Sequence, residues 1–414
     1  MRRRGAIGGG AGRAPVLALT LVLALGLVLG LGLAVAGCGS SSVPSSEAEV
    51  AGGAPVKIGY LASLTGFCAG FSREYVAGAE LAVRRIDAQG GVLGHRLQLA
   101  VRDDWATPSV ALSRTRALVM NDHVKFLAGT CTSEVAKSVA ELIANPSHVI
   151  YVVGASEASV FAGAPEAYVF DTIPTATVEG RAAAAYVRAH PRWKRIATIG
   201  EGYGYGYQVT GAFKAAMEGS GQAIVNEEYL PAGGHDYRPY IERVLAAHPD
   251  AIYSTAIAED AVTLVRQGLG LGLFRTPMLD VMDYATMAQM PELPLGMEGY
   301  TVYPSASIYG TPYARDLESL GTSVANGGAA GEGFNQIEVI AQGIEKADST
   351  DPARVRDALG GATVQTVQGA VRVGRCDHEL AMPIAMGPVT DPTTAQPFAH
   401  LEPLRVVGTD GGEC

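Results

Sequence analysis

Residues 56–94 read VKIGYLASLTGFCAGFSREYVAGAELAVRRIDAQGGVLG, and this stretch decides the fold class. Its first six residues form a short apolar run, which is typical of a buried strand. In Glu74–Asp87 the apolar residues recur at close to helical spacing, which predicts an amphipathic helix. A strand that leads through a turn into a helix is the repeating unit of parallel sheets covered by helices.

The same alternation continues along the chain. A second strand is expected at Arg96–Val101 and a helix at Pro108–Met120. The pattern restarts with a helix expected at Val178–His190 and a strand at Arg195–Ile199. The two series predict an α/β fold with two doubly wound parallel-sheet lobes. Roughly 360 residues follow Val56, a length that also suits two domains.

The N-terminal stretch predicts export. Four arginines precede an apolar run from Ala14 to Gly37 that has no charged residue and ends just before Cys38. Small residues leading to a cysteine indicate a lipoprotein signal peptide, in which residues 1–37 are removed and a lipid is attached to the Cys38 thiol. The alternative is a retained membrane-spanning helix, because the run is long enough to cross a bilayer. Either way the rest of the chain lies outside the cytoplasm.

Residues 38–54 are rich in Ser, Ala and Gly, which predicts a flexible tether. Removing residues 1–37 takes away four Arg and no acidic residue, so the formal net charge changes from −10 to about −14. Such an acidic protein is a poor partner for nucleic acid. We expect a lipoprotein on the outer side of the cell membrane or in the periplasm.

Four cysteines remain besides Cys38, an even number in a compartment where disulfides persist. They are Cys68, Cys131, Cys376 and Cys414, and they allow three pairings. A bond between Cys376 and Cys414 is favoured because both lie near the C-terminus, and buried free thiols are the alternative. No CxxC or Cys/His spacing occurs, so neither a metal nor a cofactor is expected.

In open parallel sheets, ligands bind beyond the C-terminal ends of the strands. Phe71 follows the first strand, where it either lines a ligand pocket or packs beneath its loop. Thr130, Thr132 and Ser133 follow the third strand and lead into a helix. Hydroxyls and free N–H groups at a helix N-terminus suit a carboxylate, although simple capping is the alternative.

A second hydroxyl-rich loop, Gly154-Ala155-Ser156, follows the next strand and is expected to face the first. In the second half, Gly200–Tyr207 alternates glycine and tyrosine but lacks the G-x-G-x-x-G dinucleotide fingerprint. Asp280 and Asp283 lie at the end of the strand Pro277–Val281, where one carboxylate is placed to meet an ammonium group. These loops predict a site for an amino-acid-like ligand. No G-x-S-x-G motif is present, and no catalytic residue is expected.

The chain from Val56 to about Val389 resembles the type I periplasmic binding proteins of the leucine/isoleucine/valine-binding family, which serve ABC importers. The resemblance is carried by Ile58-Gly59-Tyr60, Leu64-Thr65-Gly66, Gly78-Ala79-Glu80-Leu81-Ala82, Gly90-Gly91-Val92-Leu93-Gly94, Asp103-Asp104, Tyr205-Gly206 with Phe213, and Asp377-His378.

The resemblance implies two lobes joined by a three-segment hinge that closes on the ligand. Lobe 1 would comprise residues 55–172 plus 304–372, and lobe 2 residues 173–303 plus 373–414. The crossovers are expected near Asp171–Pro174, Tyr303–Ser305 and Gly369–Arg375. The implied fold also places the loops of Cys68 and Cys131 beside each other, which favours a disulfide between them.

The resemblance also implies roles for single residues. Ser133 would grip the ligand carboxylate, and Ser156 would serve both the carboxylate and the ammonium group. Asp283 would pair with the ammonium group, while Ile257 replaces a usually aromatic or polar contact. The complete predicted ligand-binding set is Phe71, Thr132, Ser133, Gly154, Ala155, Ser156, Tyr205, Ile257 and Asp283.

We therefore expect a non-enzymatic, lipid-anchored substrate-binding protein whose partner is an ABC permease. Its ligand would be a branched-chain or related amino acid, or a similar small carboxylate or amide. The alternative is a ligand-sensing subunit that presents a small molecule to a membrane receptor.

Overall fold

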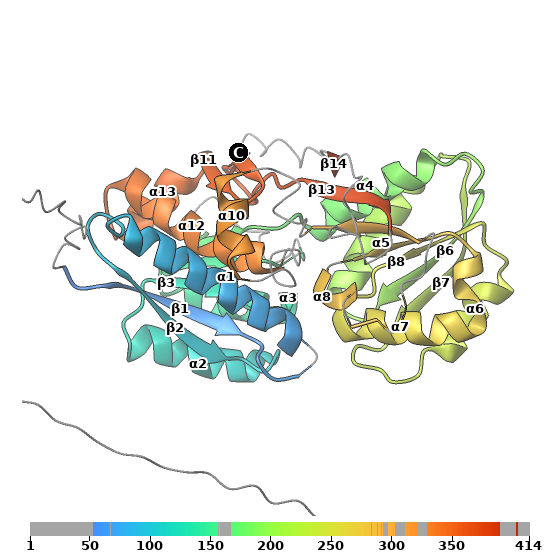
Figure 1. Ribbon diagram of the computed structural model, residues 1–414, viewed down its shortest axis with the longest axis horizontal. Coiled ribbons are helices and arrows are strands. Elements are labelled where there is room, and N and C mark those ends of the chain that lie inside the picture. Colours follow the sequence, from blue (N-terminus) through green and yellow to red (C-terminus); the bar gives the residue numbers. More distant parts are fainter. Residues whose placement is uncertain are drawn as a thin grey trace, which may run out of the picture. The chain divides into compact units, whose positions relative to one another are not determined.

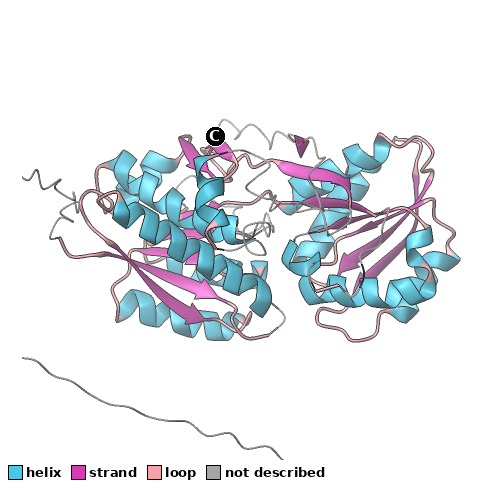
Figure 2. Ribbon diagram, viewed as in Figure 1, coloured by secondary structure: helices cyan, strands magenta, loops and turns pink. Residues whose placement is uncertain are grey.

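The computed structural model contains two sheets covered by helices (Figures 1 and 2), which confirms the predicted α/β fold with parallel-sheet lobes. All described residues belong to one unit, Ala48–Cys414. The expected signal peptide, Cys38 and most of the tether lie outside them. The structure describes residues 53–66, 68–155, 157, 167–282, 284–287, 289–290, 292, 297–302, 311–320, 329–389 and 403–404.

The first lobe is built on a five-stranded sheet in which every pair of neighbours is parallel. Its register places Ile58 opposite Leu99 on one side and Phe126 on the other. In spatial order the strands are β2 (Leu97–Asp103), β1 (Val56–Ala62), β3 (Phe126–Gly129), β4 (Ile150–Val153) and β5 (Val169–Asp171).

Helices cover both faces of this sheet because its strands are apolar on both sides. In β4, Ile150 and Val152 belong to one core, while Tyr151 and Val153 belong to the other. The first core is closed by α1 (Ala69–Ala88), α10 (Pro312–Glu318), α12 (Ala329–Ala347), α13 (Pro352–Leu359) and the hairpin β11 (Thr363–Thr366)–β12 (Gly369–Arg372). The second is closed by α2 (Pro108–Met120) and α3 (Ser133–Val139), which continues as a π-helical turn, η1 (Ala140–Ala144).

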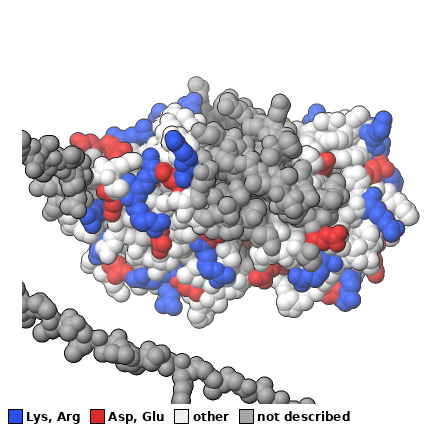
Figure 3. Space-filling model, in the orientation of Figure 1, with Lys and Arg blue, Asp and Glu red and all other residues white. Residues whose placement is uncertain are grey.

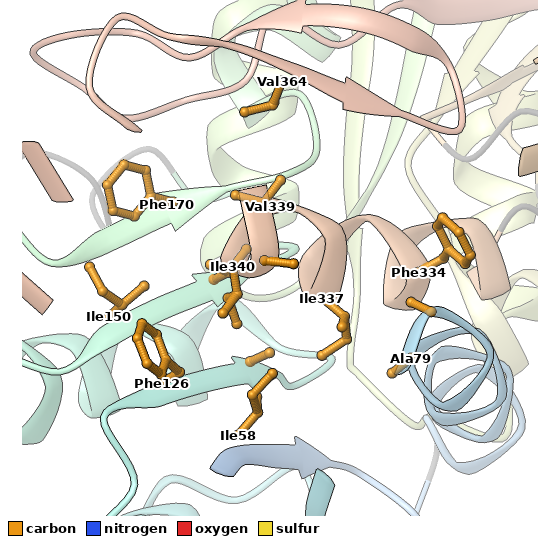
Figure 4. Close-up of a cluster of buried hydrophobic side chains, with 14 of the residues drawn as sticks. Ile58, Ala79, Phe126, Ile150, Phe170, Phe334, Ile337, Val339, Ile340 and Val364 are labelled. Atoms are coloured by element: carbon orange, nitrogen blue, oxygen red, sulfur yellow. The ribbon is translucent and has the colours of Figure 1, made fainter. Parts of the chain in front are cut away.

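Helix α12 contributes many of the buried apolar residues of the first core, although it follows α1 by some 240 residues in the chain. Figure 4 shows Ile337 and Ile340 of α12 pointing toward Ile58, Phe126 and Ile150 of the strands. Burial of side chains of this size stabilises the fold by about 1.5–3 kcal/mol each.

Two glycines let α1 and α12 approach closely. A Cβ on Gly78 of α1 would lie 1.7 Å from the carbonyl oxygen of Ala330, and a Cβ on Gly333 of α12 would lie 1.9 Å from that of Tyr75. No side chain fits at either position, so the distance between the two helices depends on both glycines.

The second lobe is built on a seven-stranded sheet, parallel except at β13 and β14, which pair antiparallel. Helices α4 and α5 pack on one face, and α6 and α7 pack on the other. In spatial order the strands are β14 (Pro403–Leu404), β13 (Ile384–Pro388), β10 (Glu298–Thr301), β9 (Met278–Val281), β8 (Ala251–Ser254), β6 (Arg195–Glu201) and β7 (Ala223–Leu230). The helices are α4 (Ala176–Arg188), α5 (Gly204–Met217), α6 (Arg238–Ala246), α7 (Ala258–Leu271), η3 (Leu273–Arg275) and α8 (Tyr284–Met287).

The chain passes between the two sheets three times: after β5, after β10 and before β13. The first passage falls at Thr172–Pro174, next to the last strand of the first sheet. The second falls among residues outside the described ranges. Leu380 and Met382 still pack in the first core, which favours a later third crossing than Gly369–Arg375. The bounds of the two lobes stay a proposal.

The structure joins Cys68, just before α1, to Cys131, just before α3, in a disulfide. Cys376 is also disulfide-bonded, but its predicted partner Cys414 lies outside the described residues. Acidic and basic side chains are interspersed over the described part of the face in Figure 3. Among the described helices, none has the length and apolar character needed to cross a membrane.

Candidate functional site

A pocket of about 660 Å³, including space open to solvent, is lined by residues of both lobes. Most of its walls come from loops at the C-terminal ends of strands, as expected for open parallel sheets. The lining residues are Phe71, Cys131, Thr132, Ser133, Gly154, Ile173, Glu179, Tyr203, Tyr205, Ile257, Ala258, Val281, Met282, Thr301 and Val302.

The first-lobe wall contains two of the three predicted hydroxyls. Thr132 is buried, and its Oγ1 has no hydrogen-bond partner among the described residues. The hydroxyl of Ser133 accepts a hydrogen bond from the N–H of Glu157 at 3.3 Å. Thr130 does not line the pocket, because its hydroxyl donates to Asp104 Oδ2 at 2.8 Å. Thr132 and Ser133 thus form the polar part of this wall.

For Phe71 the sequence left two alternatives open, lining the ligand pocket or packing beneath its loop, and the structure shows features of both. Phe71 lines the pocket, and it also packs against the first core, with its ring centre 4.8 Å from that of Tyr75. Cys131 lines the pocket beside Thr132, so the disulfide to Cys68 lies at the edge of this wall.

The loop after β4 differs in part from the prediction. Gly154 lines the pocket, but Ala155 does not: its side chain packs in the second core of the lobe, and its N–H donates to Asp171 Oδ1 at 3.3 Å. The geometry therefore does not support the predicted ligand contact of Ala155. Ser156 lies outside the described residues.

The second-lobe wall contains the predicted Tyr205 and Ile257, but Asp283 lies outside the described residues. Asp280, the neighbouring acid, is fully buried and does not line the pocket. Its pKa is raised well above the ordinary value by burial. Asp280 therefore belongs to the interior of the lobe, where its Oδ1 accepts a hydrogen bond from the N–H of Val281 at 2.9 Å.

Glu179 is the lining residue that the sequence reasoning missed. It lies in the first turn of α4 and is only 1% exposed. Its Oε2 accepts a hydrogen bond from the Tyr205 hydroxyl at 3.0 Å and from the Tyr300 hydroxyl at 3.5 Å. Burial and then the nearby Glu179 carboxyl raise the pKa of Tyr205 well above its ordinary value. Glu179 follows the first passage between the lobes and lies within a helix, so the rule that ligands bind at strand ends does not point to it.

The two lobes touch beside the pocket at the N-terminus of α5. The backbone N–H of Gly204 lies close enough to the side chain of Glu134 of α3 to favour its ionised form, although burial raises the pKa of Glu134 overall. A Cβ on Gly204 would lie 2.6 Å from Glu157 Oε2, so the Glu157 carboxyl also packs against this helix end. Negative groups are favourable at a helix N-terminus because the unpaired N–H groups there carry partial positive charge.

Three carboxyls lie behind the pocket, each on or next to a segment that connects the lobes; Asp171 and Glu332 are buried, and Glu379 is partly buried. They are Asp171 at the first passage, Glu332 at the start of α12, and Glu379 before β13. Asp171 and Glu379 pair as a β-bridge, and Thr172 donates to Glu332. Glu332 reaches the pocket wall, because a Cβ on Gly154 would lie 2.8 Å from its Oε1.

Crowding and burial shift the proton affinity of all three carboxyls upward. Burial raises the pKa of Glu332 to about 8. Burial, followed by the charge of Asp377, raises the pKa of Glu379 to about 7. The pKa of Asp171 is raised by burial and then by Glu379. Within the described ranges, no group of three or more His, Cys, Asp or Glu side chains is arranged to hold a metal ion.

A family model for periplasmic binding proteins matches residues 55–394 of the chain. A Leu/Ile/Val-binding protein of Rhizobium johnstonii is 27% identical over 328 residues, which cover 78% of this chain and 88% of the relative. A leucine-, isoleucine-, valine-, threonine- and alanine-binding protein of Pseudomonas aeruginosa is 25% identical over 324 residues, covering 76% and 84%.

Two solved structures share the fold. An ABC-transporter solute-binding protein of Rhodopseudomonas palustris, in complex with 3,4-dihydroxybenzoic acid, has a TM-score of 0.73 and 20% identity, covering 82% of this chain and 93% of its own. The branched-chain amino acid transporter substrate-binding protein of Streptococcus pneumoniae, in complex with isoleucine, has a TM-score of 0.72 and 18% identity, covering 84% and 98%.

Proposed function

This chain belongs to the periplasmic binding protein family, and we propose that it is the extracytoplasmic solute-binding protein of an ABC importer. The observation that carries the proposal is a pocket of about 660 Å³ with walls from both lobes. A ligand there would touch both lobes at once, so its binding favours the closed arrangement over an open one.

The proposed ligand is a small molecule with a carboxylate and an apolar body. The unpartnered hydroxyl of Thr132, beside Ser133, is suited to a carboxylate oxygen. Most of the second-lobe lining is apolar, including Ile257, Val281 and Val302. Relatives named for leucine, isoleucine and valine, and solved relatives holding isoleucine or a hydroxybenzoate, support a branched-chain or related amino acid or a similar carboxylate.

The proposed mechanism is hinge closure. The three segments that connect the lobes allow rotation of one lobe against the other, and the ligand would be enclosed between Thr132 and Ser133 on one side and Tyr205 on the other. The closed form would then be the one that the permease receives. We further propose that Cys38 carries the lipid that keeps the protein at the membrane; metabolic labelling with a radioactive fatty acid, lost in Cys38→Ser, tests this.

A ligand screen tests the function directly. The purified protein is melted in the presence of amino acids, amides and aromatic acids, and hits are measured by calorimetry. A ligand present at a hundred times its dissociation constant should stabilise the fold by about 2.7 kcal/mol. If no small carboxylate, amine or amide raises the melting temperature, the proposed function is wrong.

A further inference from the structure

We infer that Glu201 is a positioning residue of the binding site, because it clamps the turn between β8 and α7 that forms part of the pocket wall. The turn comprises residues 254–258, and two of them, Ile257 and Ala258, line the pocket. Glu201 itself is fully buried and does not line the pocket. The inference rests on the proposed function, and it assigns the shape of the apolar wall to a carboxyl group that lies behind it.

Glu201 holds the turn through two hydrogen bonds that run in opposite directions. Its backbone N–H donates to Thr255 Oγ1 at 3.2 Å, and its Oε1 accepts from the N–H of Ile257 at 3.1 Å. Glu201 is the last residue of β6, and β8, which leads into the turn, pairs with β6 (Figure 1). Glu201 and Thr255 are both fully buried, so water does not readily replace these hydrogen bonds.

The turn needs a clamp because its backbone is strained. Ala258 has a φ of 50°, in the left-handed region that residues with a Cβ rarely adopt. Such a conformation persists only where the surrounding structure holds it in place. The oxygen of Glu201 fixes Ile257, the residue just before the strained one. If this acceptor moves away, the turn is expected to relax and to shift both Ile257 and Ala258 in the pocket.

A second buried carboxyl, that of Asp260, lies beside the clamp. Its backbone N–H donates to the carbonyl oxygen of Ile257 at 3.1 Å, and its side chain accepts from the N–H of Gly233 at 2.9 Å and the hydroxyl of Tyr237 at 2.7 Å. Burial and then the nearby Asp260 carboxyl raise the pKa of Glu201 well above its ordinary value. A neutral Glu201 still presents an oxygen to the N–H of Ile257, so the clamp depends on where the acceptor lies and does not require its charge.

The clamped turn bears on which ligands fit. Ile257 and Ala258 belong to the mostly apolar second-lobe wall, together with Val281 and Val302. Closely packed apolar surfaces respond to small changes in shape, and such a wall separates ligands by size. Glu201 should therefore affect the preference of the pocket among ligands as well as the stability of the lobe.

The test uses two variants that separate the position of the acceptor from its charge. Glu201→Asp keeps the acid but withdraws it by one methylene group, whereas Glu201→Gln removes the acid and keeps an oxygen at the same reach. Calorimetry on the full protein measures the affinities for valine, leucine, phenylalanine, 4-hydroxybenzoate and the tightest compound of the ligand screen.

In Glu201→Asp the affinity for the tightest probe should fall about ten-fold or more, because the relaxed turn must return to its clamped form before the probe fits. The ratio of the affinities for the two tightest probes should change by about three-fold or more, since they differ in how they fill the apolar wall. Glu201→Gln should restore most of the lost affinity and the wild-type ratio.

Asp250→Glu is the matched control. Asp250 also accepts hydrogen bonds from backbone N–H groups, those of Lys194 and Arg195 at the other end of β6, but it does not line the pocket. Moving this acceptor by one methylene group should leave the affinities and their ratio unchanged. If Glu201→Asp does not fold, Thr255→Val takes its place: it removes the other acceptor of the clamp at nearly constant volume, and the same loss is expected.

Two results would overturn the inference while the proposed function stands. In the first, Glu201→Asp, or Thr255→Val in its place, unfolds more easily but keeps the wild-type affinities and ratio, which would mean that Glu201 only stabilises the lobe. In the second, Glu201→Gln loses as much affinity as Glu201→Asp, so the position of the acceptor does not decide binding. If the wild type binds none of the probes and no compound of the screen, both the inference and the proposed function fail.

Discussion

Thr132 is a buried residue whose hydroxyl has no partner among the described residues, yet it lines a pocket. A hydroxyl buried without a partner costs stability, so its presence is explained most simply by a partner that arrives with the ligand. The hydroxyl of Thr132 should therefore strengthen ligand binding while lowering the stability of the ligand-free protein.

Replacing Thr132 by Val removes the hydroxyl and keeps the shape. We expect the affinity for a carboxylate ligand to fall about ten- to a hundred-fold, because one hydrogen bond to a charged group is lost. The melting temperature without ligand should stay the same or rise. Calorimetry and thermal melting measure the two effects. The control is Thr115→Val, since Thr115 donates to Ala111 within α2 and should affect stability alone.

At this scale the sequence predicted the first-lobe wall better than the second. Thr132 and Gly154 follow strands directly, and strand ends are where the physics of parallel sheets places ligands. Glu179 could not be found in this way, because it reaches the pocket only through the packing of α4 beside Tyr205 and Tyr300. A glutamate at the start of a helix also looks like ordinary dipole pairing in a sequence.

At the scale of elements, the contact between α1 and α12 is the tightest in the first lobe. In Gly78→Ala the new methyl would overlap the carbonyl of Ala330, so the helices must move apart. We expect a loss of about 1–3 kcal/mol or more in the free energy of unfolding, measured by denaturant titration. Gly270→Ala in α7, where nothing lies within 4 Å, should instead stabilise by about 0.5–1 kcal/mol. Equal effects would contradict the packing argument.

The N-terminus of α5 is a second element-scale contact, here between the lobes. In Gly204→Ala the methyl would meet Glu157 Oε2, so closure should be hindered and ligand affinity should fall by about 1 kcal/mol, a typical coupling between contacting residues. The melting temperature without ligand should change little. Adding Glu157→Ala should restore affinity, as calorimetry would show. If the double variant binds no better than the single one, the contact does not limit closure.

The boundaries of elements were predicted less well than their order. Helix α1 was expected at Glu74–Asp87 but begins at Ala69, since the turn after Cys68 continues directly into the helix. The apolar spacing of residues 334–346 also predicts a helix, but α12 begins earlier, at Ala329. Ala, Gly and Glu in these first turns carry no helical apolar pattern, and the contacts that extend the helices are tertiary.

At the scale of the whole molecule, the three carboxyls behind the pocket make the free energy of unfolding depend on pH. The folded protein holds protons on Glu332 and Glu379 that an unfolded chain releases above about pH 4.5. The free energy of unfolding should therefore fall as the pH rises from about 4.5 to about 8, the range between the unfolded and folded pKa values.

Glu332→Gln should weaken this dependence. Gln can still accept the hydrogen bonds from Thr172 and Gln336, but it does not ionise. Melting temperatures at several pH values between 5 and about 8.5 would show a flatter profile than the wild type, with the variant more stable at the alkaline end. The exposed Glu80→Gln should keep the wild-type profile. An unchanged slope in Glu332→Gln would mean that Glu332 is ionised in the folded protein.

No pattern in the sequence predicted that these three carboxyls lie close together. Asp171, Glu332 and Glu379 are separated by more than forty residues at the least, and only the return of the chain to the first lobe brings them together. The sequence predicted that the chain crosses between lobes; it could not predict what the crossings would bury.

The disulfide between Cys68 and Cys131 has a consequence for how the protein matures. The bond closes a covalent ring that contains α1, β2, α2 and β3, and removing such a bond typically costs about 2–5 kcal/mol. Cytosolic thiols stay reduced, so the ring can close only after the chain has been exported. A molecule retained in the cytosol keeps Cys68 and Cys131 as free thiols at the edge of the pocket, where the exported protein has a disulfide. The last step in building the ligand-binding wall thus takes place in the compartment where the ligand is found.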